Sequence, residues 1–389
     1  MGVTLIPRSS PLSLLALTSL LLLATQLESA RPDQSSSVDQ RRRQQITARG
    51  VSYLRTKGQQ ADGSFSGETG PGVTALITTA LLRHNVPASD PMTARSLKYL
   101  EGFIQPSGGV HQQGTLYRNY ETCLAILCFQ EANEDGRYSE VIQKADAFIK
   151  GIQWDDGEGA KQADPGFGGA GYGKHNRPDL SNTTFFIEAL KAAGNDADSE
   201  AIQAALLFVS RSQNLESEHN TTSFAAKNPD GGFYYTPAAG GSSQAGLTEN
   251  GGLRSYASMT YAGLKSMIYA GVDANDPRVA AAVTWISQNY DLTENPGLGD
   301  AGHYYYLHTF AKALSALGQD EIEDARGKKH AWRGDLIQEL LRRQRRDGSW
   351  VNRNTRWLEG DANLVSGYAL LALSYCRPRP LAGFRGSVK

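Results

Sequence analysis

The chain has 389 residues and a formal net charge of -1, with 40% hydrophobic and 20% charged residues. This composition supplies enough apolar side chains for a core, which excludes an intrinsically disordered chain. Nucleic-acid binding needs a concentrated basic surface, whereas the basic runs here, at residues 41–43 and 342–346, are short and typical of solvated helix faces. We therefore expect no nucleic-acid partner.

Residues 1–30 have the pattern of a secretory signal peptide. Arg8 supplies a positive charge, a Leu- and Ala-rich run covers residues 11–25, and the small residues Ser29 and Ala30 follow. The apolar run is short for a membrane-spanning helix. We expect an exported protein, secreted or periplasmic, with no stable membrane span after cleavage. If the segment is not cleaved, it is expected to act as a membrane anchor.

A polar linker is expected over residues 31–45, and a repeated unit then continues to residue 378, before a C-terminal tail at 379–389. Each unit has an amphipathic helix, a Gly-rich turn and a helix that is apolar nearly all round. The amphipathic helices are predicted at Ile46–Thr56, Thr93–Ile104, Ser139–Gln153, Glu200–Gln213, Arg278–Asn289 and Gly334–Arg345. The apolar helices are predicted at Gly72–Leu82, Asn119–Phe129, Ser181–Ala193, Tyr256–Ala270, Tyr304–Leu317 and Asp361–Tyr375.

This repetition predicts an all-α protein, a single α/α toroid with an inner and an outer ring of helices. Helix pairs that recur about every 40–50 residues are typical of solenoids and toroids. An amphipathic helix exposes one face to solvent, whereas an apolar helix must be packed on all sides. The apolar helices are therefore expected in the inner ring. The terminal units resemble the middle ones and lack polar capping features, which favours a closed ring.

The turns within the units carry a more specific motif. Residues 59–65 read QQADGSF and residues 344–350 read QRRDGSW, with related turns after Gln153 and Gln213. Asp-Gly closes such a turn because Gly tolerates positive φ and Asp bonds its own backbone. These elements resemble the QW repeats of squalene–hopene cyclases and the related repeats of protein prenyltransferase β subunits. The resemblance covers roughly residues 45–378 and implies the closed toroid.

In a toroid, the N-terminal ends of the inner helices meet at one mouth of the ring, where their free N–H groups favour anionic or polarised ligands. Polar and aromatic residues recur at these ends. The substrate-binding candidates are Tyr120, Glu121, Asn182, Thr183, Arg254, Tyr256, Tyr261, Tyr305 and His308. The catalytic candidates are Asp179, Asp361 and His303.

Residues 179–183, Asp-Leu-Ser-Asn-Thr, stand where the resemblance places the proton-donating DxDDT motif of class II cyclases. The first Asp and the Thr are kept, but Ser181 and Asn182 replace the other two acids. Neither side chain donates a proton as a carboxylic acid does, so protonation-initiated cyclisation by this motif is not expected. A helix N-cap at Asp179 or Ser181 is the favoured interpretation. Asp361 is either a general acid, with His303 across the ring, or another N-cap.

The zinc site of the protein prenyltransferases is not matched. That family binds zinc through Asp, Cys and His at inner-helix starts, but His303-Tyr304-Tyr305 stands where Asp-x-Cys is expected and no Cys opens an inner helix. We therefore expect no metal and no cofactor.

Residues 211–254 form the longest non-repetitive stretch, rich in Gly, Ser, Asn and Thr. A loop of this length is often functional, and it is either a lid over the mouth or an insertion without a role there.

Three functions remain open from the sequence, and they leave open whether the chain is an enzyme. The first is a cavity lined by Tyr120, Tyr256, Tyr261, Tyr305 and Phe186 that holds an apolar isoprenoid-type molecule, with cyclase- or transferase-like activity from non-standard residues. The second is an enzyme acting on a carbohydrate polymer through two carboxylates among Glu121, Asp179 and Asp361. The third is a non-enzymatic interaction scaffold that uses the rim and the 211–254 loop.

Overall fold

The computed structural model describes residues 1–2, 34–173 and 177–377. The predicted signal peptide, apart from its first two residues, and the predicted tail at 379–389 lie outside the described residues. The chain divides into two compact units, Met1–Arg41 and Arg42–Lys389. Helix α2 (Gln34–Tyr53) begins before the expected start at Ile46, so residues 34–45 are helical. None of the helices in the described part is both long and apolar enough to cross a membrane.

Twelve α-helices are found in the described residues, and their bounds follow the six predicted pairs closely. The first members of the pairs are α2, α4 (Pro91–Glu101), α6 (Ser139–Lys150), α8 (Glu200–Arg211), α10 (Pro277–Gln288) and α12 (Trp332–Arg343). The second members are α3 (Pro71–Arg83), α5 (Arg118–Glu131), α7 (Leu180–Ala192), α9 (Ala257–Tyr269), α11 (His303–Leu317) and α13 (Ala362–Ser374).

Short elements lie in the loops between the helices. A π-helical turn at Leu54–Gly58 ends the first outer helix. Single 3-10 turns lie at Gly67–Thr69, Asp156–Glu158, Ala225–Lys227 and Arg356–Leu358. Strands β1 (Ile322–Glu323) and β2 (Lys329–His330) form a small antiparallel hairpin.

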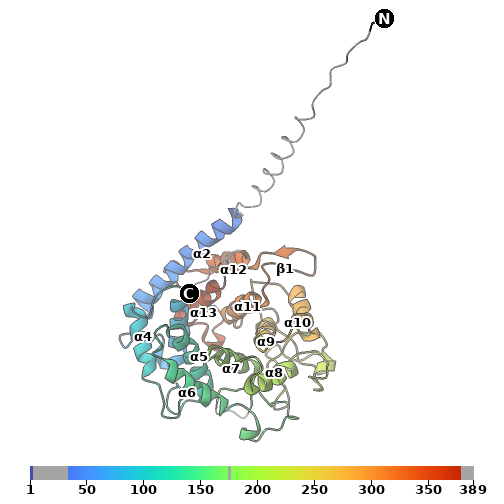
Figure 1. Ribbon diagram of the computed structural model, residues 1–389, viewed down its shortest axis with the longest axis horizontal. Helices are drawn as coiled ribbons and strands as arrows, with labels where there is room; N and C mark the ends of the chain where they lie inside the picture. Colours follow the sequence, from blue (N-terminus) through green and yellow to red (C-terminus); the bar gives the residue numbers. More distant parts are fainter. Residues whose placement is uncertain (3–33, 174–176, 378–389) are drawn as a thin grey trace. The chain divides into compact units, whose positions relative to one another are not determined.

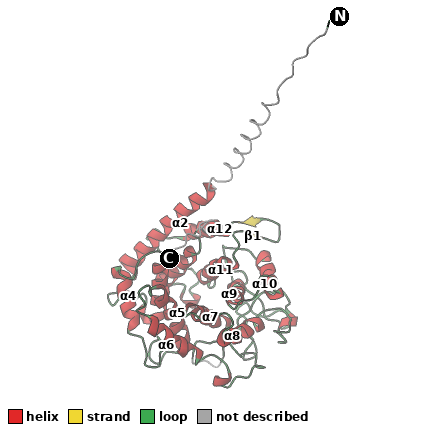
Figure 2. Ribbon diagram, in the orientation of Figure 1, coloured by secondary structure: helices red, strands yellow, loops and turns green. Residues whose placement is uncertain are grey.

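Within the unit Arg42–Lys389, the second members of the pairs form a closed inner ring. Helix α3 packs on α5, α5 on α7, α7 on α9, α9 on α11, and α11 on α13, and α13 packs back on α3. In Figures 1 and 2, α5, α7, α9, α11 and α13 surround the centre, with α4, α6, α8, α10 and α12 outside them. The all-α toroid predicted from the repeats is confirmed.

The two rings differ in burial as the sequence pattern requires. The outer helix α6 buries only Ile142, Ala145 and Ile149, which share one face at the spacing of a helical stripe. The inner helix α13, in contrast, buries every residue from Leu364 to Leu373. An outer helix thus contributes one face to the core, whereas an inner helix has neighbours on all sides.

Glutamines in four of the repeated turns join one outer helix to the next. The side-chain N–H groups donate to carbonyl oxygens in the following outer helix, at 2.8 Å for Gln59 to Met92, 2.9 Å for Gln153 to Ala201, and 2.8 Å for Gln213 to Arg278. Gln344 makes the same contact with the Ile46 carbonyl at 2.8 Å, and so joins the last repeat to the first.

The Asp-Gly turns bring the backbone of each turn close to the next outer helix. Gly63 and Gly348 both have φ of 93°. A Cβ atom at either position would lie 2.4 Å from a backbone oxygen, that of Arg95 or of Arg49 respectively. Only glycine satisfies both the positive φ and this close approach.

Candidate functional site

A cavity of about 310 Å³ lies at the N-terminal ends of the inner helices. All six inner helices, or the loops that lead into them, contribute to its wall. Its apolar and aromatic lining comprises Gly72, Val73, Tyr117, Tyr120, Tyr172, Phe185, Tyr235, Tyr256, Met259, Tyr305, Trp357, Leu358, Leu364 and Tyr368. Its polar lining comprises Thr69, Glu121, Ser181, Asn182, Gln244, Ser258 and Glu359.

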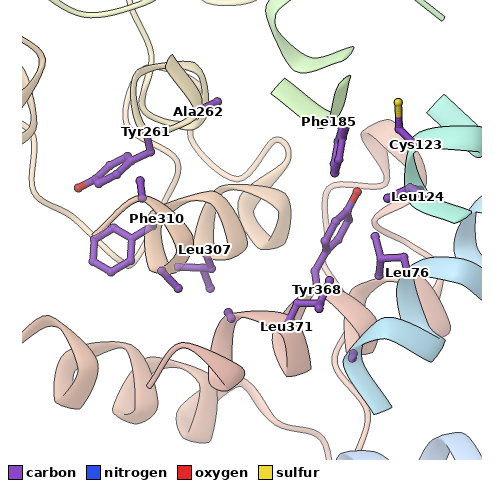
Figure 3. Close-up of a cluster of buried hydrophobic side chains, with 14 of the residues drawn as sticks. Leu76, Cys123, Leu124, Phe185, Tyr261, Ala262, Leu307, Phe310, Tyr368 and Leu371 are labelled. Atoms are coloured by element: carbon purple, nitrogen blue, oxygen red, sulfur yellow. The ribbon is translucent and has the colours of Figure 1, made fainter. Parts of the chain in front are cut away.

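Aromatic rings in edge-to-face contact make up much of the wall. The Tyr120 ring lies 5.3 Å from Phe185, nearly perpendicular to it, and the Tyr305 ring lies 6.3 Å from Phe185 and 5.9 Å from Tyr368. Figure 3 shows Phe185 of α7 and Tyr368 of α13 pointing toward one another. This wall offers ring faces and edges to an occupant, with tyrosine hydroxyls as scattered polar groups.

Two carboxylates border the cavity, and each accepts a hydrogen bond from a backbone amide. Glu121 accepts hydrogen bonds from the Gln112 amide at 2.8 Å and the Thr115 hydroxyl at 3.2 Å. Glu359 accepts from the Tyr305 amide at 2.8 Å, at the start of α11. Burial raises the pKa of both carboxyls above the ordinary glutamate value, against these hydrogen bonds.

Asp179 is the N-cap of α7 and lies behind the cavity wall. Its two carboxylate oxygens accept from the amide and the side-chain N–H of Asn182, at 3.0 and 2.8 Å. Burial raises the pKa of Asp179 to about 6, although these hydrogen bonds and the neighbouring Tyr235 hydroxyl oppose the shift. Asp179 does not line the cavity, whereas Asn182 and Tyr235, which contact its carboxyl, do.

The structure brings Tyr120, Glu121, Asn182, Tyr256 and Tyr305 together around the cavity. These substrate-binding candidates all lie at or near the start of an inner helix.

Tyr261 and Phe186 do not line the cavity. The ring of Tyr261 packs 5.1 Å from Phe310 and 5.7 Å from Tyr306, in the core between α9 and α11. Figure 3 shows Tyr261 beside Phe310, away from Phe185 and Tyr368. Phe186 is fully buried one position after Phe185, and a single helical step turns it away from the lumen.

Five other candidates also lie outside the cavity wall, namely Thr183, Arg254, Asp361, His303 and His308. Thr183 is buried and exchanges hydrogen bonds with the backbone of Ala170, which fixes the loop before α7. Arg254 is exposed and donates to the Leu247 carbonyl at 2.8 Å. Asp361 caps α13 and accepts from the Asn363 amide at 2.7 Å.

His303 is fully buried, and its Nε2 lies 2.9 Å from the Leu292 carbonyl. Burial lowers the pKa of His303 to about 4, so the ring is neutral near pH 7. His308 faces a separate small void in the ring, and burial also lowers its pKa well below the ordinary histidine value.

Several lining residues have no signal in the helix pattern, because they lie in loops or in the middle of a helix. Tyr172, Tyr235 and Trp357 belong to connecting segments, and Tyr368 lies one and a half turns into α13. The 211–254 loop contributes Tyr235 and Gln244 to the wall. Aromatic residues in the loops before the inner helices were the available clue to this set.

The mouth of the cavity is bordered by a strained turn. Trp357 and Leu358 have φ of 54° and 63°, and 45% and 54% of their surface is exposed. Positive φ at two non-glycine residues costs about 1–3 kcal/mol each. The preceding Arg356 donates to the Gln244 side chain at 2.6 Å, and so connects this turn with the 211–254 loop.

Within the described residues, no group of three or more His, Cys, Asp or Glu side chains is placed to bind a metal ion. Residues 68–237 match the family model of the squalene-hopene cyclase C-terminal domain. No curated protein matches the chain significantly. The matched segment runs from the turn before α3 through α8 into the long loop, and so includes three of the inner helices.

Proposed function

Because the chain is a member of the squalene cyclase and terpenoid cyclase-like superfamily, matched over residues 68–237, we propose that its ring holds an apolar isoprenoid-type molecule. The molecule would occupy the cavity at the N-terminal ends of the inner helices. The proposal includes export directed by residues 1–30 as a signal peptide, so the protein would bind the molecule outside the cytoplasm.

The aromatic lining is the observation that carries this proposal. Seven tyrosines, one phenylalanine and one tryptophan border a cavity of about 310 Å³. Ligand sites are concave and mostly apolar, with a few polar groups that fix orientation. Burial of a branched hydrocarbon against such rings contributes about 25 cal/mol for each Å² of apolar surface removed from water. The isolated polar groups suit one oxygen on the molecule, such as a hydroxyl.

Cyclase-like chemistry would need an acid other than the family's DxDD. Asp179 does not line the cavity, and both of its oxygens are already hydrogen-bonded. The tyrosine faces could stabilise a carbocation by cation–π attraction. Since Ser181 and Asn182 cannot donate a proton as an acid, the geometry supports binding better than protonation.

The carbohydrate alternative is less well supported. Glycoside hydrolysis needs two carboxylates with oxygens free to act on the bond and on water. In Glu121 and in Asp179, both oxygens accept hydrogen bonds from the protein. Asp361 is engaged as the cap of α13. A scaffold role is also less favoured, because a scaffold needs no cavity lined by aromatic side chains such as the one at this end of the ring.

The proposal is tested by extracting the purified protein with organic solvent and identifying bound lipids by mass spectrometry. Gly72 lines the cavity at the start of α3, and a Cβ there would meet Tyr120 at 3.4 Å, an ordinary contact. Gly72→Leu should therefore fill the cavity without disturbing the backbone. We expect a stoichiometric isoprenoid from the wild type and a large loss of it from Gly72→Leu.

Ala94→Leu is the matched control, because Ala94 is exposed on the outer helix α4 and the change adds a leucine away from the cavity. This variant should retain the lipid at the wild-type level. A wild-type extract without lipid, combined with failure of added isoprenoid alcohols to bind, would contradict the proposal. Equal lipid in the wild type and Gly72→Leu would place the lipid elsewhere.

A further inference from the structure

A second cavity, of about 550 Å³, lies at the opposite, C-terminal ends of the inner helices. Its wall includes the last residues of α3, α5, α7, α9 and α13. Its charged lining comprises Arg83, Glu131, Glu188, Lys191, Lys312 and Arg377. This lining has more basic than acidic groups, in contrast to the aromatic wall of the first cavity.

Three charged side chains meet in the interior beside this second cavity. Lys265 of α9 donates to one carboxylate oxygen of Glu188 of α7, and Lys312 of α11 donates to the other. The side chains are 1%, 2% and 6% exposed for Lys265, Glu188 and Lys312. We call these three residues the lysine–glutamate cluster. Two ammonium groups thus share one carboxylate in the interior, which leaves one positive charge in excess.

The count of two ammonium groups rests on the contacts of the two lysines with Glu188; burial lowers the pKa of Lys312, and Glu188 opposes that shift. Burial opposes ionisation of Glu188, but Lys265 and Lys312 outweigh it and lower the pKa of the carboxyl to about 2. Burial lowers the pKa of Lys265 to about 8, with Glu188 acting against the shift. Glu188 is therefore ionised and Lys265 still mainly protonated near pH 7.

The cluster also has hydrogen-bond donors without acceptors. An ammonium group has three N–H donors, and each lysine here makes a single hydrogen bond to the described residues. Buried donors without partners and buried excess charge are both costly. Water entering the cavity could accept from the N–H groups, but it would not balance the charge.

Neighbouring groups do not supply the missing negative charge. Arg83 is already paired with Glu131 at 2.6 Å and donates to the Tyr375 hydroxyl at 2.5 Å. The negative ends of the inner helices are near, but a helix dipole acts mainly within the last turn, and Lys265 and Lys312 lie at least one turn before the ends of α9 and α11.

His308 is a second, independent sign of a ligand site. It is 4% exposed, and its Nδ1 has no hydrogen-bond partner among the described residues. It borders a small void of about 20 Å³ together with Glu188, Lys312 and Arg83. These three residues line the second cavity as well, so the void beside His308 and the second cavity share part of their walls.

We propose that the lysine–glutamate cluster binds a small oxyanion, a phosphate or a carboxylate, that enters from the second cavity and contacts Lys312. The oxyanion balances the excess charge and accepts from the free N–H groups, and Lys191 and Arg377 at the cavity rim attract it. This site is separate from the aromatic cavity and does not depend on the function proposed for it.

The test is calorimetric titration of the full-length protein with inorganic phosphate and, in parallel, with butyrate, at an ionic strength held constant with chloride. Lys312→Met is the informative variant, because it leaves Glu188 and Lys265 as a balanced pair and should fold. We expect saturable binding of one of the two anions to the wild type. We expect the affinity to fall by about tenfold or more in Lys312→Met, the loss of one charge-assisted contact.

Lys144→Met is the control, because it removes the same charge from an exposed position on α6. It should bind the anion with wild-type affinity. In Glu188→Gln two buried lysines lack a counter-charge, so its melting temperature should rise more with the anion than that of the wild type. Failure of the wild type to bind either anion saturably, or equal affinity in Lys312→Met and Lys144→Met, would refute the proposal.

Discussion

Single ionisable residues in this protein titrate far from their ordinary values because the inner ring excludes water. His303 and Asp179 lie at the starts of α11 and α7, and both are buried. Burial lowers the pKa of His303 to about 4 and raises the pKa of Asp179 to about 6. In both cases the neutral form is favoured, so the two residues make stability change with pH in opposite directions.

For His303, the unfolded chain binds a proton below about pH 6.5, whereas the folded protein binds it only below about pH 4. The contribution of His303 is therefore fully present above pH 6.5 and is lost as the pH falls to 4, by about 3 kcal/mol. His303→Gln should be less stable than the wild type at pH 8, and its free energy of unfolding should fall less steeply below pH 6.5.

Urea unfolding between pH 4 and 8 measures this difference, and the Asp179 contribution cancels because both proteins contain it. With its raised pKa, Asp179 lowers stability as the pH rises from about 4 to 6, the opposite sign. Parallel pH profiles for wild type and His303→Gln would mean that His303 titrates normally.

At the level of single elements, side-chain caps explain several residues that the sequence singled out for chemistry. Asp179 caps α7 and Asp361 caps α13, and each accepts from backbone amides of the first turn. Glu359 lies in the segment before α13 but also binds a free helix amide, since it accepts from the Tyr305 amide in the first turn of α11. Free amides at a helix start must find acceptors, and a short acidic side chain provides one.

Asp361 separates capping from acid catalysis experimentally. Asp361→Ala should cost about 1 kcal/mol of unfolding free energy, whereas Asp361→Asn should cost only a few tenths, since asparagine caps about as well as aspartate. Urea unfolding at pH 7 measures both. Equal losses in the two variants would show that the charge, and not the cap, is the important property.

At the scale of the whole molecule, the ring must close between repeats that are far apart in sequence. The Gln344 side chain donates to the Ile46 and Gly348 carbonyls at 2.8 and 2.9 Å. Gln153 makes the equivalent pair of bonds within the ring, to Ala201 and Gly168 at 2.9 and 2.8 Å. The closing junction therefore has the same geometry as an internal junction.

Gln344→Leu and Gln153→Leu should consequently destabilise the protein by similar amounts. Each leaves two carbonyl groups without a side-chain donor, at a cost of about 2–4 kcal/mol in total. Chemical unfolding gives the two values, and hydrogen exchange in α12 reports local opening. A much smaller loss in Gln344→Leu, with fast exchange in α12, would mean that the ring opens at this junction.

The helix pairs and their order could be derived from the amino-acid sequence, because the signals involved are local. An amphipathic stripe, an all-apolar helix and an Asp-Gly turn each depend on residues a few positions apart. The terminal units resemble the middle ones, which is why closure was also predictable. The cavity candidates Tyr120, Tyr256 and Tyr305 followed from their place at the starts of inner helices.

The tertiary structure decided what each side chain faces, because that depends on neighbours distant in sequence. Phe185 and Phe186 are adjacent and chemically identical, yet only Phe185 borders the aromatic cavity. Tyr261 looked like Tyr256 in the sequence, but the packing of α9 on α11 buries it against Phe310. The lysine–glutamate cluster joins three inner helices, and no spacing along the chain predicts that those three charges meet.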